Sequence, residues 1–188
     1  MKPYCVLDCE SLSEIQSQTL AWLQQRYDLS DQSSLLTDLW LKIDTKDFLR
    51  HTPALMSWFR SLKLLCKETA ITVVNDMAGA KLHIDELPVV AKINIPILNC
   101  ANVINQWYHV PDHVLASINT VKNQYGADYY FLDQVDVNQC TLVGTLELQQ
   151  PVVFNSQIAH NVTCLPGAKF PRVVLTCMFI NEPIEYLV

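Results

Sequence analysis

Apolar residues recur at helical spacing in the first 68 residues. One set begins within "SLSE", where a serine precedes a glutamate by three residues as in a capping box; it comprises Leu12, Ile15, Trp22 and Leu23. The other lies in "TPALMSWFRSLKLL", which offers a threonine N-cap and a proline at the first helical position; it comprises Leu55, Met56, Phe59 and Leu62. Three- and four-residue spacing places each set on one helix face. We therefore predict amphipathic helices that pack their apolar stripes on the core.

The pattern changes near residue 68. Short segments rich in β-branched and aromatic residues follow, separated by turn signals such as "YHVPDH", "NQYGAD" and "LPGAKFP". The predicted strands are 69–74, 89–98, 102–108, 128–132, 141–146, 151–154, 159–163 and 173–180. Short strands after a helical lead-in predict a mainly β, α+β fold, either an antiparallel barrel or a jelly roll with helices on one side. We expect one domain over 1–188, with a helical lead-in (1–68) and a jelly-roll core (69–188), because 188 residues suit one domain and the helical stripes need a sheet to cover.

Composition narrows the function classes. Half of the residues are hydrophobic and 17% are charged, which suits a buried core and argues against disorder. The net charge is −6, and the 13 basic residues form no run, so we expect no nucleic-acid partner. With only four glycines, the chain lacks the glycine-rich motifs of nucleotide-binding proteins and serine hydrolases.

The lengths of the apolar runs and the number of cysteines bear on where the protein is located in the cell. The run "VVLTCMFI" is too short to span a bilayer, and the N-terminus lacks the apolar segment of a signal peptide. Seven scattered cysteines suit free thiols in a reducing compartment. Cys5 and Cys9 have no second pair to complete a zinc site. We expect a cytoplasmic protein without a membrane partner, and the sequence carries no signal for an oligomeric state.

The candidate chemistry starts in "HID", where His83 and Asp85 stand two positions apart. Residues i and i+2 of a strand point the same way, so both side chains can reach one metal ion. Non-haem iron is held by two histidines and one carboxylate. His160 lies in a predicted strand 160 − 85 = 75 residues after Asp85, which is enough chain to return to the same place. Arg172 begins an apolar strand, where a buried guanidinium needs a carboxylate partner such as a bound dicarboxylate.

"HID" followed by "FNSQIAHNVTCLPGAKFPRVVLTCMF" resembles the HxD…H…R pattern of the Fe(II)/2-oxoglutarate-dependent oxygenases, and its distal part is similar to the aspartyl/asparaginyl β-hydroxylase branch. The resemblance covers roughly residues 80–180. It implies a double-stranded β-helix of the jelly-roll, cupin-like type. It also implies a dioxygenase that hydroxylates an amino-acid or peptide side chain, or another small metabolite, while 2-oxoglutarate is converted to succinate and carbon dioxide.

The resemblance assigns roles by position. His83, Asp85 and His160 would hold Fe(II), Arg172 would bind the distal carboxylate of the cosubstrate 2-oxoglutarate, and Asn94 is a candidate for a cosubstrate hydrogen bond. The implied partners are molecular oxygen and a small-molecule or peptide substrate. Further pocket-lining candidates are Asn99, Trp107 and Tyr108.

Two alternatives stay open on sequence grounds. One is a cupin-like metalloenzyme of another class, which would keep the metal ligands without needing Arg172. The other is a non-catalytic binding module on the same fold. For Cys100 we predict a buried free thiol, because no base is visible beside it. The remaining histidines are predicted to bind no metal: His51, His109 and His113.

Overall fold

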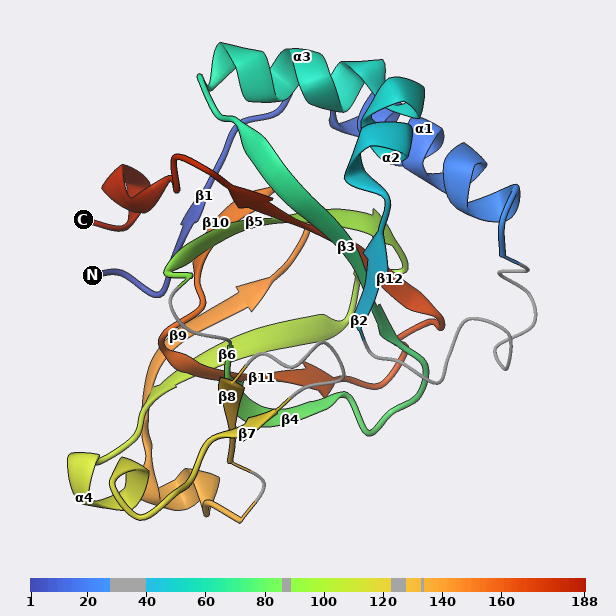
Figure 1. Cartoon of the computed structure of the whole chain (residues 1–188). Coiled ribbons are helices and arrows are strands. Elements are labelled where there is room, and N and C mark those ends of the chain that lie inside the picture. Colours follow the sequence, from blue (N-terminus) through green and yellow to red (C-terminus); the bar gives the residue numbers. More distant parts are fainter. Residues whose placement is uncertain (28–39, 86–88, 123–127, 133) are drawn as a thin grey trace.

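The computed structural model describes residues 1–27, 40–85, 89–122, 128–132 and 134–188. Within these residues the chain forms two six-stranded sheets that face each other, with helices above one of them (Figure 1). In the first sheet, sheet A, the strand order is β1 (Tyr4–Val6), β10 (Val152–Asn155), β5 (Ala91–Leu98), β12 (Arg172–Phe179), β3 (Cys66–Val74) and β2 (Trp40–Ile43).

The second sheet, sheet B, lies below sheet A in Figure 1. Its strand order is β7 (Val121–Lys122), β8 (Asp128–Phe131), β4 (Ala80–Ile84), β11 (Ala159–Cys164), β6 (Val103–His109) and β9 (Thr141–Glu147). Every strand pairing in the described residues is antiparallel. The sheets are separate there, so this part of the chain is mainly β without being a closed barrel.

The chain passes repeatedly from one sheet to the other. Sheet A contains the neighbours β10–β5–β12–β3, and sheet B contains β4–β11–β6–β9. Consecutive strands β3, β4, β5 and β6 therefore alternate between the sheets, as do β9, β10, β11 and β12. As a result, residues far apart in sequence line the space between the sheets.

Three helices cover the outer face of sheet A: α1 (Leu12–Gln24), α2 (Thr45–His51) and α3 (Pro53–Ser61) (Figure 1). Alternate residues of the central strands, including Ile93 and Leu175, share one hydrophobic cluster with Ile15, Leu55 and Phe59 of the helices. Because side chains alternate across a strand, the residues between them point toward sheet B. A short helix α4 (Asp112–Leu115) and the 3-10 turns η1 (Val137–Gln139) and η2 (Ile184–Leu187) complete the described elements.

Both predicted helical stripes are confirmed, since Ile15, Leu23, Leu55 and Phe59 are buried. The cap chemistry differs from the prediction. Ser11 makes no side-chain capping bond, so no capping box forms. The Thr52 hydroxyl instead donates to Phe48 O at 2.9 Å, closing the end of α2 before Pro53 starts α3.

Each predicted strand overlaps a strand of the structure, with bounds that differ by a few residues. The sequence pattern did not predict β1, β2, β4, β7, α2 or α4. Two of these strands, β1 and β2, lie in the segment expected to be helical and extend sheet A at its two edges. In the described part of the chain, no helix has the length and apolarity needed to cross a bilayer. All seven cysteines are free.

Candidate metal centre

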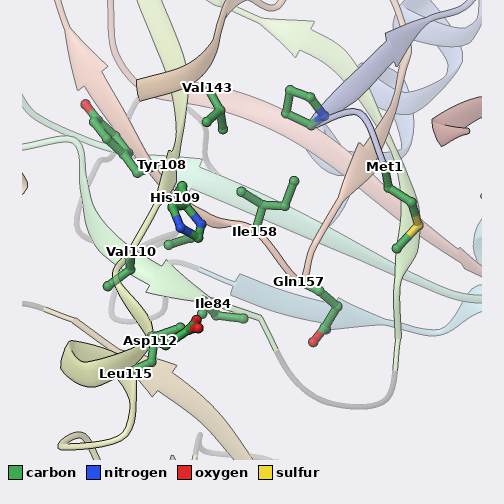
Figure 2. Close-up of a pocket in the computed structure, with 12 residues that line it drawn as sticks. Met1, Ile84, Tyr108, His109, Val110, Asp112, Leu115, Val143, Gln157 and Ile158 are labelled. Carbon is green, nitrogen blue, oxygen red and sulfur yellow. The ribbon is translucent and has the colours of Figure 1, made fainter. Parts of the chain in front are cut away.

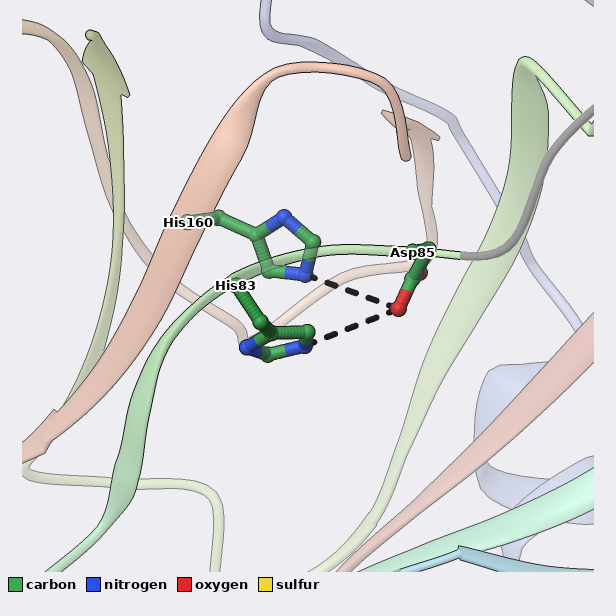
Figure 3. Close-up of side chains that lie close together, drawn as sticks. All are labelled: His83, Asp85 and His160. Atoms are coloured by element: carbon green, nitrogen blue, oxygen red, sulfur yellow. Dashed lines mark ion pairs between the residues drawn. The ribbon is translucent and has the colours of Figure 1, made fainter. Parts of the chain in front are cut away.

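Three side chains predicted as ligands meet in the space between the sheets. His83 of β4 is the direct cross-strand partner of His160 of β11. Asp85 follows β4 and points the same way as His83, as the HxD spacing requires, and its amide donates to Ser156 O at 3.1 Å. One candidate ligand atom from each residue lies within 4.8 Å of the others (Figure 3). The structure thus brings residues 83, 85 and 160 together.

The distances suit a shared ion. Asp85 Oδ1 lies 3.5 Å from His83 Nε2 and 4.0 Å from His160 Nε2 (Figure 3). Ligand atoms bound at about 2.0–2.2 Å to one ion lie within about 4.4 Å of each other. Phe154 packs edge-on against the His160 ring at 4.6 Å, which helps to fix its orientation.

Both imidazoles present the same nitrogen to the site. His83 Nδ1 lies 2.8 Å from Lys81 O, and His160 Nδ1 lies 2.8 Å from Ile158 O. A carbonyl oxygen only accepts, so Nδ1 carries the proton in each ring. In the neutral rings Nε2 then has the free lone pair, directed toward Asp85. Metal-binding histidines generally donate their second ring N–H in this way.

Burial and neighbouring charges shift the pKa values of the three side chains in different directions. Burial and the neighbouring His83 lower the pKa of His160 to about 3, although Asp85 opposes this shift. Burial alone would raise the pKa of Asp85, but the Lys92 ammonium and the hydrogen bond from His83 outweigh it and hold the pKa well below its usual value. Burial lowers the pKa of His83, yet the hydrogen bond and charge of Asp85 reverse this and raise it. Near neutral pH, Asp85 is ionised and His160 is neutral.

A lysine that the sequence analysis did not single out joins this group. Lys92 on β5 of sheet A is 2% exposed, and its Nζ lies 3.1 Å from Asp85 Oδ2. Its ammonium also lies 5.1 Å from the centroid of the Trp40 ring. The sequence did contain a signal for this lysine, because a charge within the apolar run "VVAKINIPIL" needs a carboxylate partner if it is buried. The same reasoning predicts a carboxylate partner for Arg172.

Arg172 is the first residue of β12 and is 2% exposed. Its Nη2 donates to Asn105 Oδ1 of β6 at 3.4 Å, while its Nε is buried without a hydrogen-bond partner. Burial lowers the pKa of the guanidinium, against the influence of Cys100 and Cys164. In the described residues no ion pair joins Arg172 to a carboxylate. Among the described residues the Arg172 guanidinium therefore has no counter-ion, which an external anion would supply.

Asn94 and Trp107 each leave a polar atom unused in the same space. Asn94 lies two residues after Lys92 on β5 and hence on the same face, and its Oδ1 is buried without a partner. Trp107 on β6 pairs with His160, and its Nε1 is likewise buried without a partner. Buried polar atoms of this kind are costly unless something bonds to them.

The other two pocket-lining candidates do not face the metal centre. Tyr108 packs in a hydrophobic cluster on the outer face of sheet B and lines a pocket there (Figure 2). Asn99 holds a loop instead, with its Nδ2 donating to Pro171 O at 2.9 Å. Cys100 is a buried thiol whose Sγ donates to Val173 O, and burial raises its pKa, as expected for a thiol without a nearby base.

A pocket of about 350 Å³ lies outside the centre (Figure 2). Its lining includes Ile84 and Ala159, which neighbour the candidate ligands in sequence but point to the opposite face of sheet B. None of the three candidate ligands lines it. The three remaining histidines are also apart from the centre: His51, His109 and His113 belong to no candidate metal cluster of the described residues.

No protein-family model matches the chain, and no curated protein matches it. Among solved structures, the chain is similar to AviO1 from Streptomyces viridochromogenes Tue57, with 10% identity, 97% of this chain and 92% of that chain covered, and a TM-score of 0.50. That likeness indicates a shared fold. Two further matches are structures of ThoJ, a non-heme monooxygenase, each with 16% identity and 94% of this chain covered. The apo form is covered to 71% with a TM-score of 0.44. The nickel complex is covered to 72% with a TM-score of 0.37.

Proposed function

We propose that this protein is an Fe(II)- and 2-oxoglutarate-dependent oxygenase that hydroxylates an amino-acid or peptide side chain or another small metabolite. The observation that carries the proposal is the convergence of His83, Asp85 and His160 in the space between the sheets, with their ligand atoms within 4.8 Å of one another. Two imidazoles and one carboxylate are the donor set of non-haem iron oxygenases, which leave other metal positions for substrate and oxygen.

The residues present fit an iron ion. Each Nδ1 proton is held by a backbone carbonyl, so Nε2 is the atom through which each ring, when neutral, would bind the ion. Asp85 supplies the single negative charge, and its Oδ1 is the oxygen that faces both imidazoles. Three protein donors on one side of the ion suit a site that must bind further ligands.

The residues also fit a dicarboxylate cosubstrate. Arg172 is a buried cation with an unused Nε–H, and a carboxylate would satisfy it with charge-assisted hydrogen bonds. The unused Oδ1 of Asn94 only accepts hydrogen bonds, so it would bond to a water molecule or a substrate donor and not to the carboxylates of 2-oxoglutarate. We assign the distal carboxylate of 2-oxoglutarate to Arg172.

The strand order supports the fold that belongs to this activity. We propose that β3–β6 and β9–β12 form a double-stranded β-helix of the jelly-roll, cupin-like type, with β1, β2, β7 and β8 as additions. The neighbours β10–β5–β12–β3 and β4–β11–β6–β9 are the two four-stranded sheets that such a winding produces. In this fold the ligand space lies between the sheets.

The chain's own residues have three tasks in the reaction. His83, Asp85 and His160 hold the metal, and the carbonyls of Lys81 and Ile158 keep both rings in the orientation that exposes Nε2. Arg172 orients the cosubstrate through its distal end. When bound, iron and 2-oxoglutarate would supply the oxidative chemistry, in which molecular oxygen gives one atom to the substrate and one to succinate while the cosubstrate loses carbon dioxide.

Apolar side chains beside the centre limit the access of water. Phe154 and Trp107 are 5% and 0% exposed, and the Phe154 ring contacts both Trp107 and His160. Excluding water protects reactive species and strengthens the electrostatic contacts within the site.

The proposal is tested by following succinate formation by NMR. Purified protein is incubated with Fe(II), 2-oxoglutarate and ascorbate in air, alone and with panels of amino acids and short peptides. We expect succinate above the protein-free rate, further stimulated by a substrate with an equivalent of hydroxylated product.

Two variants make this test specific. His160→Ala removes a ligand and should abolish succinate formation, whereas His113→Ala removes an exposed histidine of α4 and should leave it unchanged. Metal-dependent turnover of another kind without 2-oxoglutarate would favour the cupin-like alternative. A folded wild-type protein that binds neither Fe(II) nor 2-oxoglutarate would contradict the proposal.

A further inference from the structure

The Asp85 carboxylate has two distinct sides. Its Oδ1 faces the imidazoles of His83 and His160, at 3.5 and 4.0 Å. Its Oδ2 faces the opposite sheet, where Lys92 Nζ lies at 3.1 Å. One oxygen is therefore presented to the metal site and the other to a resident cation.

Lys92 is buried more deeply than its partner. The Lys92 side chain is 2% exposed, against 22% for Asp85. A buried ammonium without a counter-ion is very costly, so Lys92 depends on Asp85 as much as Asp85 depends on Lys92. The Trp40 ring beside the ammonium adds a favourable cation–π contact but no negative charge.

Metal binding places a second cation on the same carboxylate. Two cations that share one carboxylate repel each other, and burial removes the water that would screen them. Lys92 thus lowers the affinity of the site for a divalent ion while stabilising the protein before the ion is bound. It also engages Oδ2, leaving Oδ1 as the oxygen free to coordinate.

We propose that Lys92 is the built-in counter-ion of Asp85: a positioning residue that keeps the metal-free protein folded, restricts Asp85 to one coordinating oxygen and weakens metal binding. This inference rests on the metal site of the proposed function and adds to it a reason for a weak, exchangeable metal. It assigns a role to a lysine that contacts neither the imidazoles nor Arg172 through any described hydrogen bond.

The test compares wild-type protein with Lys92→Met, which keeps the length of the side chain and removes its charge. Co(II) affinity is measured by calorimetric titration of chelator-treated protein, and the Tm of the metal-free protein is measured in EDTA. We expect Lys92→Met to bind Co(II) at least about tenfold more tightly. We expect its metal-free Tm to fall by about 5–15 °C, because the Asp85 charge loses its partner.

Lys42→Met is the matched control. Lys42 also lies on a strand of sheet A and pairs with a carboxylate, Glu68, at 2.8 Å, but Glu68 is not a candidate ligand. Its substitution should leave the Co(II) affinity unchanged. A tightening of equal size in both variants would reflect net charge alone and would overturn the inference.

The outcomes separate a counter-ion from a merely structural lysine. A lower Tm with unchanged or weaker Co(II) binding would show that Lys92 only packs and supports the fold, and the inference would be wrong. If Lys92→Met does not fold, the double variant Lys92→Met/Asp85→Asn decides. It has no unpaired charge, so recovery of a folded protein supports the ion pair, and failure to fold overturns it.

The same data separate this inference from the proposed function. If wild-type protein binds no Co(II), the proposed metal site fails and the inference fails with it. If wild-type protein binds Co(II) and Lys92→Met does not bind it more tightly, only the role of Lys92 is overturned.

Discussion

His83 and His160 face each other on adjacent strands, yet their pKa values are shifted in opposite directions. The pKa of His83 is raised by Asp85, and that of His160 is lowered to about 3 by burial and by His83. A buried cluster in which the one carboxylate already contacts an ammonium disfavours an imidazolium at His160. The unequal pKa values have a measurable effect on the stability of the metal-free protein.

We predict that His160 makes the metal-free protein less stable as the pH falls from 6 to 4. Unfolded His160 gains a proton below its usual pKa of 6.5, whereas the folded residue stays neutral until about 3, so protonation favours the unfolded state in this window. The loss is about 2 kcal/mol over the two pH units. His83 does not offset it, because stability from a raised pKa is already complete below 6.5.

The check is urea unfolding in EDTA at several pH values, comparing wild-type protein with His160→Gln. The variant should have a shallower fall in the free energy of unfolding between pH 6 and 4. His113→Gln, at an exposed position, should keep the wild-type slope. Parallel curves for wild-type protein and His160→Gln would mean that His160 is protonated in the folded protein.

Arg172 is predicted to act on the cosubstrate and not on the metal. Arg172→Met should weaken 2-oxoglutarate binding by about 10–100-fold, the effect of losing charge-assisted hydrogen bonds worth about 1.5–3 kcal/mol. Metal affinity should be unchanged, because Arg172 bonds to Asn105 and to none of the candidate ligands. Calorimetry with each component, using exposed Arg60→Met as the control, measures both effects. Equal losses of metal and cosubstrate would indicate a structural role for Arg172.

At the scale of elements, the site depends on the pairing of β4 with β11. This pairing contains an irregularity between His160 and Val162, and it aligns His160 with His83 and Val162 with Ala80. Gly79 precedes Ala80 with a φ of +67°, and a Cβ at this position would collide with Val162 O. A glycine is therefore required where β4 approaches β11.

We predict that Gly79→Ala loosens this pairing. It should lower the free energy of unfolding by about 1–3 kcal/mol through backbone strain and steric conflict. It should also weaken metal binding, since displacing β4 moves His83 and Asp85 away from His160. Gly167→Ala is the control, with a comparable φ of +91° and only the Asn102 side chain nearby. Similar metal affinity in the two variants would mean that the pairing does not position the ligands.

The HxD spacing was enough to predict that His83 and Asp85 point the same way, because alternation is a local property of a strand. The strand itself was missed, since "AKLHI" places Lys81 and His83 on a polar inner face and lacks a run of β-branched residues. The register that aligns His160 with His83 depends on contacts between residues 77 positions apart (160 − 83 = 77) and on an irregular pairing, which no local pattern encodes. Lys92 was missed because it stands in a strand that otherwise reads as core.

For the whole molecule, the helical lead-in and sheet A share one hydrophobic cluster. Leu55 and Phe59 of α3 belong to it together with Ile93 and Leu175 of sheet A. The helices therefore form the outer layer of sheet A (Figure 1). The centre lies on that sheet's other side, where Lys92 of sheet A contacts Asp85. The apolar stripes predicted this packing of the helices, whereas the edge strands β1 and β2 were too short to be recognised.

We predict that Leu55→Ala destabilises the molecule as one unit. Removing a fully buried leucine should lower the free energy of unfolding by about 2–5 kcal/mol. Far-UV circular dichroism and tryptophan fluorescence should report one shared transition, because helices and sheets unfold together. Leu65→Ala, at an exposed position, should have little effect. Two separate transitions would contradict a single domain over 1–188.

We propose that His83, Asp85 and His160 hold an iron ion to which 2-oxoglutarate binds. The most direct measurement is anaerobic addition of Fe(II) and then 2-oxoglutarate to the folded protein, followed by visible absorption spectroscopy. We predict a weak charge-transfer band from the iron chelate, lost in His160→Ala and retained in His113→Ala. Absence of the band in folded wild-type protein would mean that no such iron chelate forms. Its persistence in His160→Ala would mean that His160 is not a ligand.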